Sequence, residues 1–211
     1  MSRRIIGLTG NIATGKSAVM RLAAERGALT IDADRVVHEL LDGDAEIQEA
    51  VVAAFGPGVR RADGRIDRAA LGRVVFGDPA QLGRLEAILH PAARAEIARR
   101  VARNDAPVVV IEAIKLLEGP LAGLCDQVWV TACARETQLA RLRVCRGMDP
   151  ADAAARIDAQ NPQEAKIARA DVVIHTDGLL RETEAQVERA WAALMSGGAG
   201  GQGSGGEQKD T

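Results

Sequence analysis

Residues 10–17 read Gly10-Asn11-Ile12-Ala13-Thr14-Gly15-Lys16-Ser17 and directly follow the apolar run Ile5-Ile6-Gly7-Leu8-Thr9. The octapeptide fits the pattern G-x-x-x-x-G-K-[S/T], whose glycines let several backbone N–H groups face a phosphate. The lysine of this pattern reaches the β- and γ-phosphates, and the hydroxyl of Ser17 ligates Mg²⁺. The stretch therefore predicts a buried strand, a phosphate-binding loop and a helix whose positive end adds to the site. The expected nucleotide-binding residues are Gly10, Ala13, Thr14, Gly15, Lys16, Ser17 and Ala18.

The rest of the chain alternates between short apolar runs and helical patterns. Strands are expected at 5–8, 28–31, 107–112, 127–130 and 172–174. Helical spacing occurs at 16–26, 36–41, 47–55, 69–76, 82–89, 135–145 and 182–195, and a further helix begins at Asp149-Pro150. Pro91 is expected to interrupt the helix of 82–89, which resumes through Val101. These patterns predict an α/β fold with a five-stranded, mostly parallel sheet and a helical insertion after the second strand.

Composition narrows the possible functions. The 27 basic and 29 acidic residues give a net charge of −2, and only four residues are aromatic, so a nucleic-acid-binding surface is not expected. Three cysteines without C-x-x-C spacing indicate neither a disulfide framework nor a zinc site. No apolar run approaches 18 residues, so no membrane association is expected, and we expect a cytoplasmic protein. The Gly-rich segment 196–211 is typical of a disordered tail.

Two carboxylates follow the second strand, at the end where open α/β sheets bind ligands. Asp32 is as well placed to cap the next helix as to bind a ligand, and the sequence leaves both readings open. Asp34 lies just past the cap position and is free to face the crevice. We therefore expect a functional role for Asp34.

A phosphotransferase also needs positive charge from a mobile element. Arg141, Arg143 and Arg146 lie on one helix and at its end, and a solvated face would explain all three. Arg146 is beside the flexible Gly147, so it is the better candidate to contact the transferred phosphate.

Several other polar residues have two readings. His90 precedes Pro91 and is expected at a kink, where its imidazole either lines a pocket or is structural. Glu112 and Glu118 either approach Mg²⁺ or pair with Lys115. Simpler structural roles are expected for His38 and His175, for Trp129 and Trp191 in the core, and for Cys125, Cys133 and Cys145 as small buried side chains.

These landmarks together resemble one family. Neither D-x-x-G nor [N/T]-K-x-D occurs, which disfavours a signalling GTPase. The series is similar to that of dephospho-CoA kinases over residues 5 to about 194. It comprises Gly7-Leu8-Thr9-Gly10, Asp32-Ala33-Asp34, Leu85-Glu86-Ala87-Ile88-Leu89-His90-Pro91, Gln138 with Arg141-Leu142, Arg146-Gly147-Met148, Arg156-Ile157 with Ala159-Gln160, Lys166, and Ala170-Asp171-Val172-Val173-Ile174 before Asp177-Gly178.

The resemblance implies ATP-dependent phosphorylation of the 3′-hydroxyl of dephospho-CoA, with Mg²⁺, on a P-loop NTPase-type three-layer fold. It implies a core of residues 1–34, 105–135 and 168–195, a CoA-binding helical insertion at about 35–104, and a helical lid at about 136–167. Lys16, Asp34 and Arg146 would be catalytic, Thr9, Asp32, Asp34 and His90 would contact the acceptor, and Arg141 and Arg146 would belong to the lid. Another small-molecule or nucleoside monophosphate kinase, or a non-catalytic nucleotide switch, remains the alternative.

The sequence departs from the family pattern at three places. Glu112 to Glu118 replaces the usual Pro-Leu-Leu-Phe-Glu after the third strand, Asn11 and Ala13 stand where glycines are common, and Thr176 replaces an asparagine. The first change puts the local substrate contacts in doubt, and the last weakens any inference about adenine contacts. Oligomeric state does not follow from the sequence.

Overall fold

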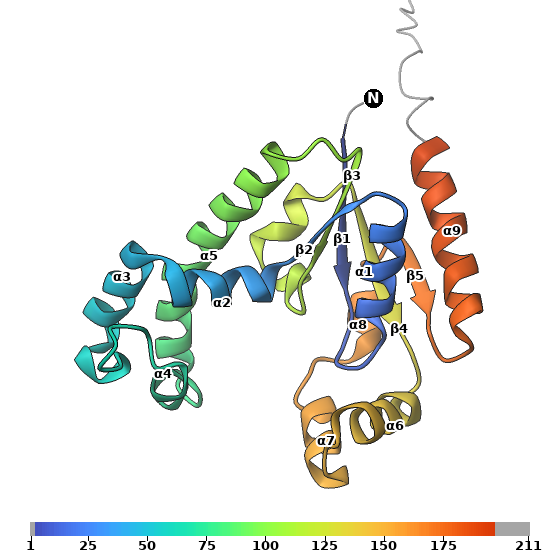
Figure 1. Ribbon diagram of the computed structural model, residues 1–211. Helices are drawn as coiled ribbons and strands as arrows, with labels where there is room; N and C mark the ends of the chain where they lie inside the picture. Colours follow the sequence, from blue (N-terminus) through green and yellow to red (C-terminus); the bar gives the residue numbers. More distant parts are fainter. Residues whose placement is uncertain (1–2, 197–211) are drawn as a thin grey trace, which may run out of the picture.

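A five-stranded sheet lies at the centre of the computed structural model, which describes residues 3–196 (Figure 1). The strands are β1 (Arg4–Thr9), β2 (Leu29–Asp32), β3 (Val108–Glu112), β4 (Gln127–Ala132) and β5 (Val172–His175). Their order in the sheet is β2-β3-β1-β4-β5, and all four neighbouring pairs are parallel. The sheet predicted to be mostly parallel is thus wholly parallel, because each connection between successive strands, made of α-helices or of 3₁₀ turns, returns the chain to the edge where the strands begin.

The helices are α1 (Lys16–Glu25), α2 (Ala33–Gly43), α3 (Ala45–Phe55), α4 (Arg68–Val75), α5 (Pro79–Ala102), α6 (Arg135–Arg146), α7 (Pro150–Asp158), α8 (Gln163–Ile167) and α9 (Leu180–Ser196). Three short 3₁₀ turns add η1 (Pro57–Val59), η2 (Leu116–Glu118) and η3 (Pro120–Leu124). Side chains at Asp32, Asp44, Asp67, Asp78 and Asp149 cap the helices that follow them. Short polar side chains thus fix where five of the helices begin.

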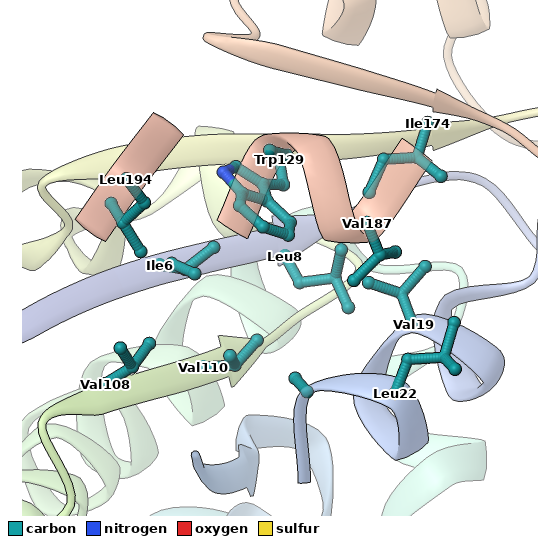
Figure 2. Close-up of a cluster of buried hydrophobic side chains, with 12 residues drawn as sticks. Ile6, Leu8, Val19, Leu22, Val108, Val110, Trp129, Ile174, Val187 and Leu194 are labelled. Atoms are coloured by element: carbon teal, nitrogen blue, oxygen red, sulfur yellow. The ribbon is translucent and has the colours of Figure 1, made fainter. Parts of the chain in front are cut away.

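Two apolar layers enclose the sheet. On one face α1 and α9 pack against it through a cluster that contains Ile6, Leu8, Val19, Trp129 and Val187 (Figure 2). On the other face, the start of α2, the second half of α5 and η2 form a second cluster with the strands. Trp129 is 1% exposed, as expected for a core residue, whereas Trp191 is only partly buried against the same cluster.

The helices α2 to α5 extend to one side of the sheet and have a core of their own (Figure 1). Its buried members are Leu41, Val51, Val59, Ile66, Leu71, Val75, Leu85 and Leu89. This is the helical insertion expected after the second strand, and its own apolar core gives it a fixed shape beside the carboxyl end of β2.

α5 crosses Pro91 without a break, so the predicted interruption of this helix is wrong. Leu85 and Leu89 pack in the core of α2–α5, while Ala93 and Ile97 pack in the cluster under the sheet. These four side chains thus form one continuous apolar stripe along α5. The first half of the stripe packs in the core of α2–α5, and the second half packs in the cluster under the sheet. This packing outweighs the hydrogen bond that the proline removes.

Other expectations at the edges of the fold need correction. Cys133 is buried and Cys125 is partly buried, but Cys145 is exposed, so it is not the small buried side chain expected there. α9 runs through Ser196, the first residue of the predicted disordered tail, and the rest of that segment lies outside the described residues. No helix among residues 3–196 is long and apolar enough to cross a membrane.

Replacing Pro91 by alanine should stabilise the protein, because alanine restores a backbone donor and removes the clash of the proline ring. The gain should be about 2 kcal/mol after allowance for the freer unfolded chain, which raises the melting temperature by roughly 4–8 °C. Pro79→Ala is the matched control, since Pro79 occupies the first turn of the same helix, where proline is favourable. A Pro91→Ala protein that melts no higher than wild type would contradict this account of α5.

Candidate active site

The carboxyl ends of the parallel strands meet on one edge of the sheet, and the phosphate-binding loop lies there between β1 and α1 (Figure 1). Gly10 and Gly15 have φ of 153° and 90°, and Ala13 is the one non-glycine residue with positive φ in the described chain, at 60°. A Cβ at Gly10 would come within 2.6 Å of the Thr131 carbonyl oxygen, so only glycine fits there. The left-handed backbone at Ala13 is costly and must be held by its surroundings.

Lys16 folds back over the loop. Its Nζ donates to the carbonyl oxygens of Gly10 at 2.9 Å and Asn11 at 3.1 Å, and it lies 3.8 Å from Oε1 of Glu112 at the end of β3. Burial lowers the pKa of Lys16, and the charge of Glu112 opposes that shift. The Lys16 ammonium thus lies over the opening of the loop. A bound triphosphate would accept its hydrogen bonds in place of the two carbonyl oxygens.

Glu112 does not pair with Lys115, so that reading is wrong for this residue. Lys115 donates instead to Glu86 on α5, at 3.1 Å. Burial raises the pKa of Glu112, Lys16 lowers it, and the neighbouring charges of Asp32 and Asp34 raise it further. Three carboxylates therefore lie near one another at this edge of the sheet, with Lys16 beside them.

Asp32 caps α2, since its side chain accepts a hydrogen bond from the Arg35 N–H at 2.9 Å. Asp34, in the first turn of α2, is open to a cavity instead. Desolvation by the surrounding protein raises the pKa of Asp34, the charge of Asp32 raises it further, and the charge of Lys16 lowers it. Asp32 thus caps the helix, whereas Asp34 faces the space where a ligand would bind.

That space is a cavity of about 530 Å³ between α2, α5 and the segment after β3. Asp34 and Glu86 contribute carboxylates, and Lys115 and Arg94 contribute cations. The remaining lining residues are Ala33, Val37, His38, Phe76, Leu82, Leu85, Leu89, His90, Ala93, Ala113, Glu118, Gly119, Pro120 and Leu121. The cavity lining combines apolar side chains with a few charged ones, as is usual for a ligand-binding pocket.

Two histidines line the cavity. His90 lines the cavity, but it lies within the unbroken α5 and not at a kink. His38 also lines the cavity, and its charge lowers the pKa of Asp34. Helical periodicity correctly predicted that His38 lies on a helix. It could not predict that α5 lies opposite this residue across the cavity.

Arg141 and Arg146 occupy different environments on α6. Arg141 donates to the carbonyl oxygen of Ala13 and to the side-chain oxygen of Thr176, each at 3.0 Å, and to the Thr176 carbonyl oxygen. Arg146 is exposed at the last residue of α6, before Gly147 with its left-handed φ of 59°. Arg141 therefore braces the loop, whereas Arg146 is free of such contacts.

Two threonines that the sequence analysis did not predict for the site hold Thr14. The Thr131 hydroxyl lies 2.7 Å from that of Thr14, and the Thr176 hydroxyl donates to the Thr14 carbonyl oxygen at 2.9 Å. Thr9 is also buried, and its hydroxyl donates to the Ile114 carbonyl oxygen at 3.1 Å. Residues at the ends of three strands thus bond to the loop or to the cavity wall.

Comparisons with known proteins agree on one family. The dephospho-CoA kinase family profile matches residues 4–182. A dephospho-CoA kinase of Symbiobacterium thermophilum is 48% identical over 200 residues, which cover 93% of this chain and 84% of the relative. One of Geobacter sulfurreducens is 43% identical over 191 residues, covering 89% and 97%. The chain belongs to the dephospho-CoA kinase family.

Solved structures place the fold in the same group. A Thermus thermophilus protein superposes with a TM-score of 0.79 at 32% identity, covering 93% of this chain and 98% of that one. The dephospho-CoA kinase of Campylobacter jejuni gives 0.66 at 26% identity, covering 92% and 98%. A shikimate kinase of Bacteroides thetaiotaomicron, at 15% identity and a TM-score of 0.50, shows a likeness of fold alone. The three-layer P-loop kinase fold expected for a dephospho-CoA kinase is therefore confirmed.

The capping role of Asp32 can be tested separately from any effect of its charge. Asp32→Ala should be less stable than Asp32→Asn by about 1 kcal/mol, because asparagine keeps the cap and alanine does not. Both variants remove the charge beside Asp34, so the difference between them isolates the cap. Chemical denaturation without ligand measures it. Equal stabilities would show that the bond to the Arg35 N–H does not anchor α2.

Proposed function

We propose that the protein transfers the γ-phosphoryl group of ATP to the 3′-hydroxyl of dephospho-CoA and forms coenzyme A and ADP. The observation that carries the proposal is the position of Asp34. It lines the cavity beside α5, and its charge also acts on Lys16 of the phosphate-binding loop. One carboxylate thus borders both the expected phosphate donor and the space for the acceptor, in a chain of the dephospho-CoA kinase family.

The donor site is expected to be the loop and the first turn of α1. Backbone N–H groups of Gly10, Ala13, Thr14, Gly15, Lys16, Ser17 and Ala18 are the candidates to bind the phosphates of ATP. The Lys16 ammonium would leave its carbonyl acceptors for the β- and γ-phosphates. Since phosphoryl transfer needs little covalent help, this alignment and charge neutralisation form the main part of catalysis.

The acceptor hydroxyl is expected beside Asp34. A carboxylate whose pKa is raised by burial is the more basic one, so it is better able to accept a hydroxyl proton. The hydroxyl oxygen then bonds to the γ-phosphorus, the bond to the oxygen bridging the β- and γ-phosphates breaks, and ADP leaves. Asp34 would hold the proton until it returns to solvent.

Mg²⁺ fits the acidic strand ends. No group of three His, Cys, Asp or Glu in residues 3–196 could hold a metal by itself, but Mg²⁺ usually binds one or two protein oxygens together with substrate phosphates. Ser17 and Glu112 are the candidates, and the mutually repelling carboxylates Asp32, Asp34 and Glu112 favour a cation there. When bound, the ion would neutralise charge on the phosphates.

We assign the remaining segments by their place around this site. The helices between residues 35 and 104 would bind the body of dephospho-CoA along the cavity, with Thr9, Asp32 and His90 near the acceptor. Residues 136–167 would form the lid, and Arg146 at the end of α6 would reach the transferred phosphoryl group when the lid closes and excludes water. An enzyme that uses these substrates is expected in the cytoplasm.

Acceptor dependence tests the proposal. ADP release from ATP and Mg²⁺ should be fast with dephospho-CoA, slow with AMP and slowest without an acceptor, and EDTA should abolish it. A coupled ADP assay with the purified protein measures all three rates, and chromatography identifies coenzyme A as the product. Release that is equally fast without dephospho-CoA would refute the kinase assignment, and preference for AMP would indicate a nucleoside monophosphate kinase.

Asp34→Asn should lower turnover by at least about 10²-fold, because the amide cannot accept the hydroxyl proton. The affinity for ATP should stay near that of wild type. Asp32→Asn keeps the cap and is the matched comparison, and its loss of turnover should be much smaller than that of Asp34→Asn. If Asp32→Asn abolishes turnover while Asp34→Asn remains active, the acceptor carboxylate is Asp32.

Arg146→Ala should lower kcat more than it weakens binding of ATP, because the guanidinium would meet the phosphoryl group mainly after lid closure. Arg143→Ala, an exposed arginine on the same helix, should leave both parameters near wild type. Steady-state kinetics together with calorimetric ATP binding separate the two effects. An unchanged kcat in Arg146→Ala would remove this residue from the mechanism.

A further inference from the structure

The phosphate-binding loop is bonded to the segment that runs from α6 to the residues after α7. Asn11 donates through its side chain to the Asn161 carbonyl oxygen at 3.0 Å, and Ala13 accepts from Arg141. Between them, the Ile12 side chain packs with Ala13 against an apolar cluster of α6 and α7 that contains Leu142, Ala153 and Ile157. Three consecutive loop residues are therefore attached to the segment that the proposed function assigns to the lid.

The peptide groups of Ile12 are held from both sides by two glutamines. Gln138 on α6 donates through Nε2 to the Ile12 carbonyl oxygen at 2.8 Å. Gln160, two residues beyond the end of α7, accepts from the Ile12 N–H through Oε1 at 2.7 Å. One glutamine thus acts as donor and the other as acceptor, and the backbone fixes both assignments.

These bonds lie in a protected place. Gln138 is only 5% exposed, although it is a polar residue in the first turn of α6, and its amide is directed at the loop. Gln160 is half-buried. Ile12 is not among the expected phosphate-binding residues, so its N–H and carbonyl groups are available for attachment. The N–H groups of Ala13 and Gly15 donate to no acceptor in the described chain and stay available for a ligand.

We propose that Gln138 and Gln160 are positioning residues that fix Ile12 and so hold the phosphate-binding loop in its nucleotide-binding shape. The next residue, Ala13, has the unfavourable left-handed backbone, and the loop needs external partners to keep it there. The two glutamines supply these partners from the start of α6 and from just after α7, so the loop is attached to the lid segment at these two points. The inference rests on the proposed function only in placing a nucleotide at this loop.

Gln138→Met and Gln160→Met test the proposal, because methionine has a similar shape and cannot form these bonds. Each variant should raise the KM for ATP by at least about fivefold, the ratio expected from loss of one buried hydrogen bond, and leave the KM for dephospho-CoA unchanged. Gln186→Met is the matched control, since Gln186 holds the N–H and carbonyl of His175 in the same way on β5. Its KM for ATP should stay within twofold of wild type.

A second readout is the rise in melting temperature that ATP causes when no acceptor is present. This readout does not depend on the identity of the acceptor. It should shrink in both Gln variants and stay normal in the control. The double variant should bind ATP no more than about twofold more weakly than the worse single variant, because either change already releases the same peptide. A KM for ATP raised less than fivefold in either single variant, or effects that multiply in the double variant, would overturn the proposal. Because Gln160 is half-buried, Gln160→Met keeps the test valid if Gln138→Met fails to fold.

Discussion

The structure depends on a loop whose backbone N–H groups must remain available for phosphate. A loop of this kind cannot be stabilised by its own internal bonds alone, and Gly10, Ala13 and Gly15 all have positive φ. The surrounding chain supplies what the loop lacks. Thr131 and Thr176 hold Thr14, and the α6–α7 segment holds residues 11–13. The sheet and the α6–α7 segment therefore together support the left-handed turn of the loop.

Parallel strands explain why the other polar groups gather at the same place. Each parallel strand ends on the same edge of the sheet, so Asp32 at the end of β2 and Glu112 at the end of β3 come close to the loop after β1. The burial of Glu112 and the neighbouring charges of Asp32 and Asp34 favour a cation at this place, and Lys16 provides one. The apolar core of α2–α5 fixes the cavity wall opposite Asp34. The shape of the cavity thus follows from apolar packing within α2–α5.

Local signals in the sequence predicted the five strands, the phosphate-binding loop and the cap at Asp149, because each depends on a few adjacent residues. The course of α5 across Pro91 was not predictable in this way, since it results from two apolar cores that anchor the halves of the helix. The same holds for the Glu112–Lys16 pair, for His38 in the cavity and for Arg141 on the loop. These contacts join residues far apart in the chain, and helical periodicity gives no information about them. The burial predicted for Cys145 was wrong because it was inferred from the apolar character of cysteine alone. The prediction did not consider on which face of α6 the residue lies.

The most direct test of the account is the structure of the protein with a non-hydrolysable ATP analogue and dephospho-CoA bound together. The account predicts that the β-phosphate lies against the N–H groups of Gly15 to Ser17 and that the 3′-hydroxyl of dephospho-CoA lies within hydrogen-bonding distance of Asp34. The rest of the acceptor should lie along the cavity between α2 and α5. A 3′-hydroxyl bound at Asp32, or an acceptor bound outside this cavity, would contradict it.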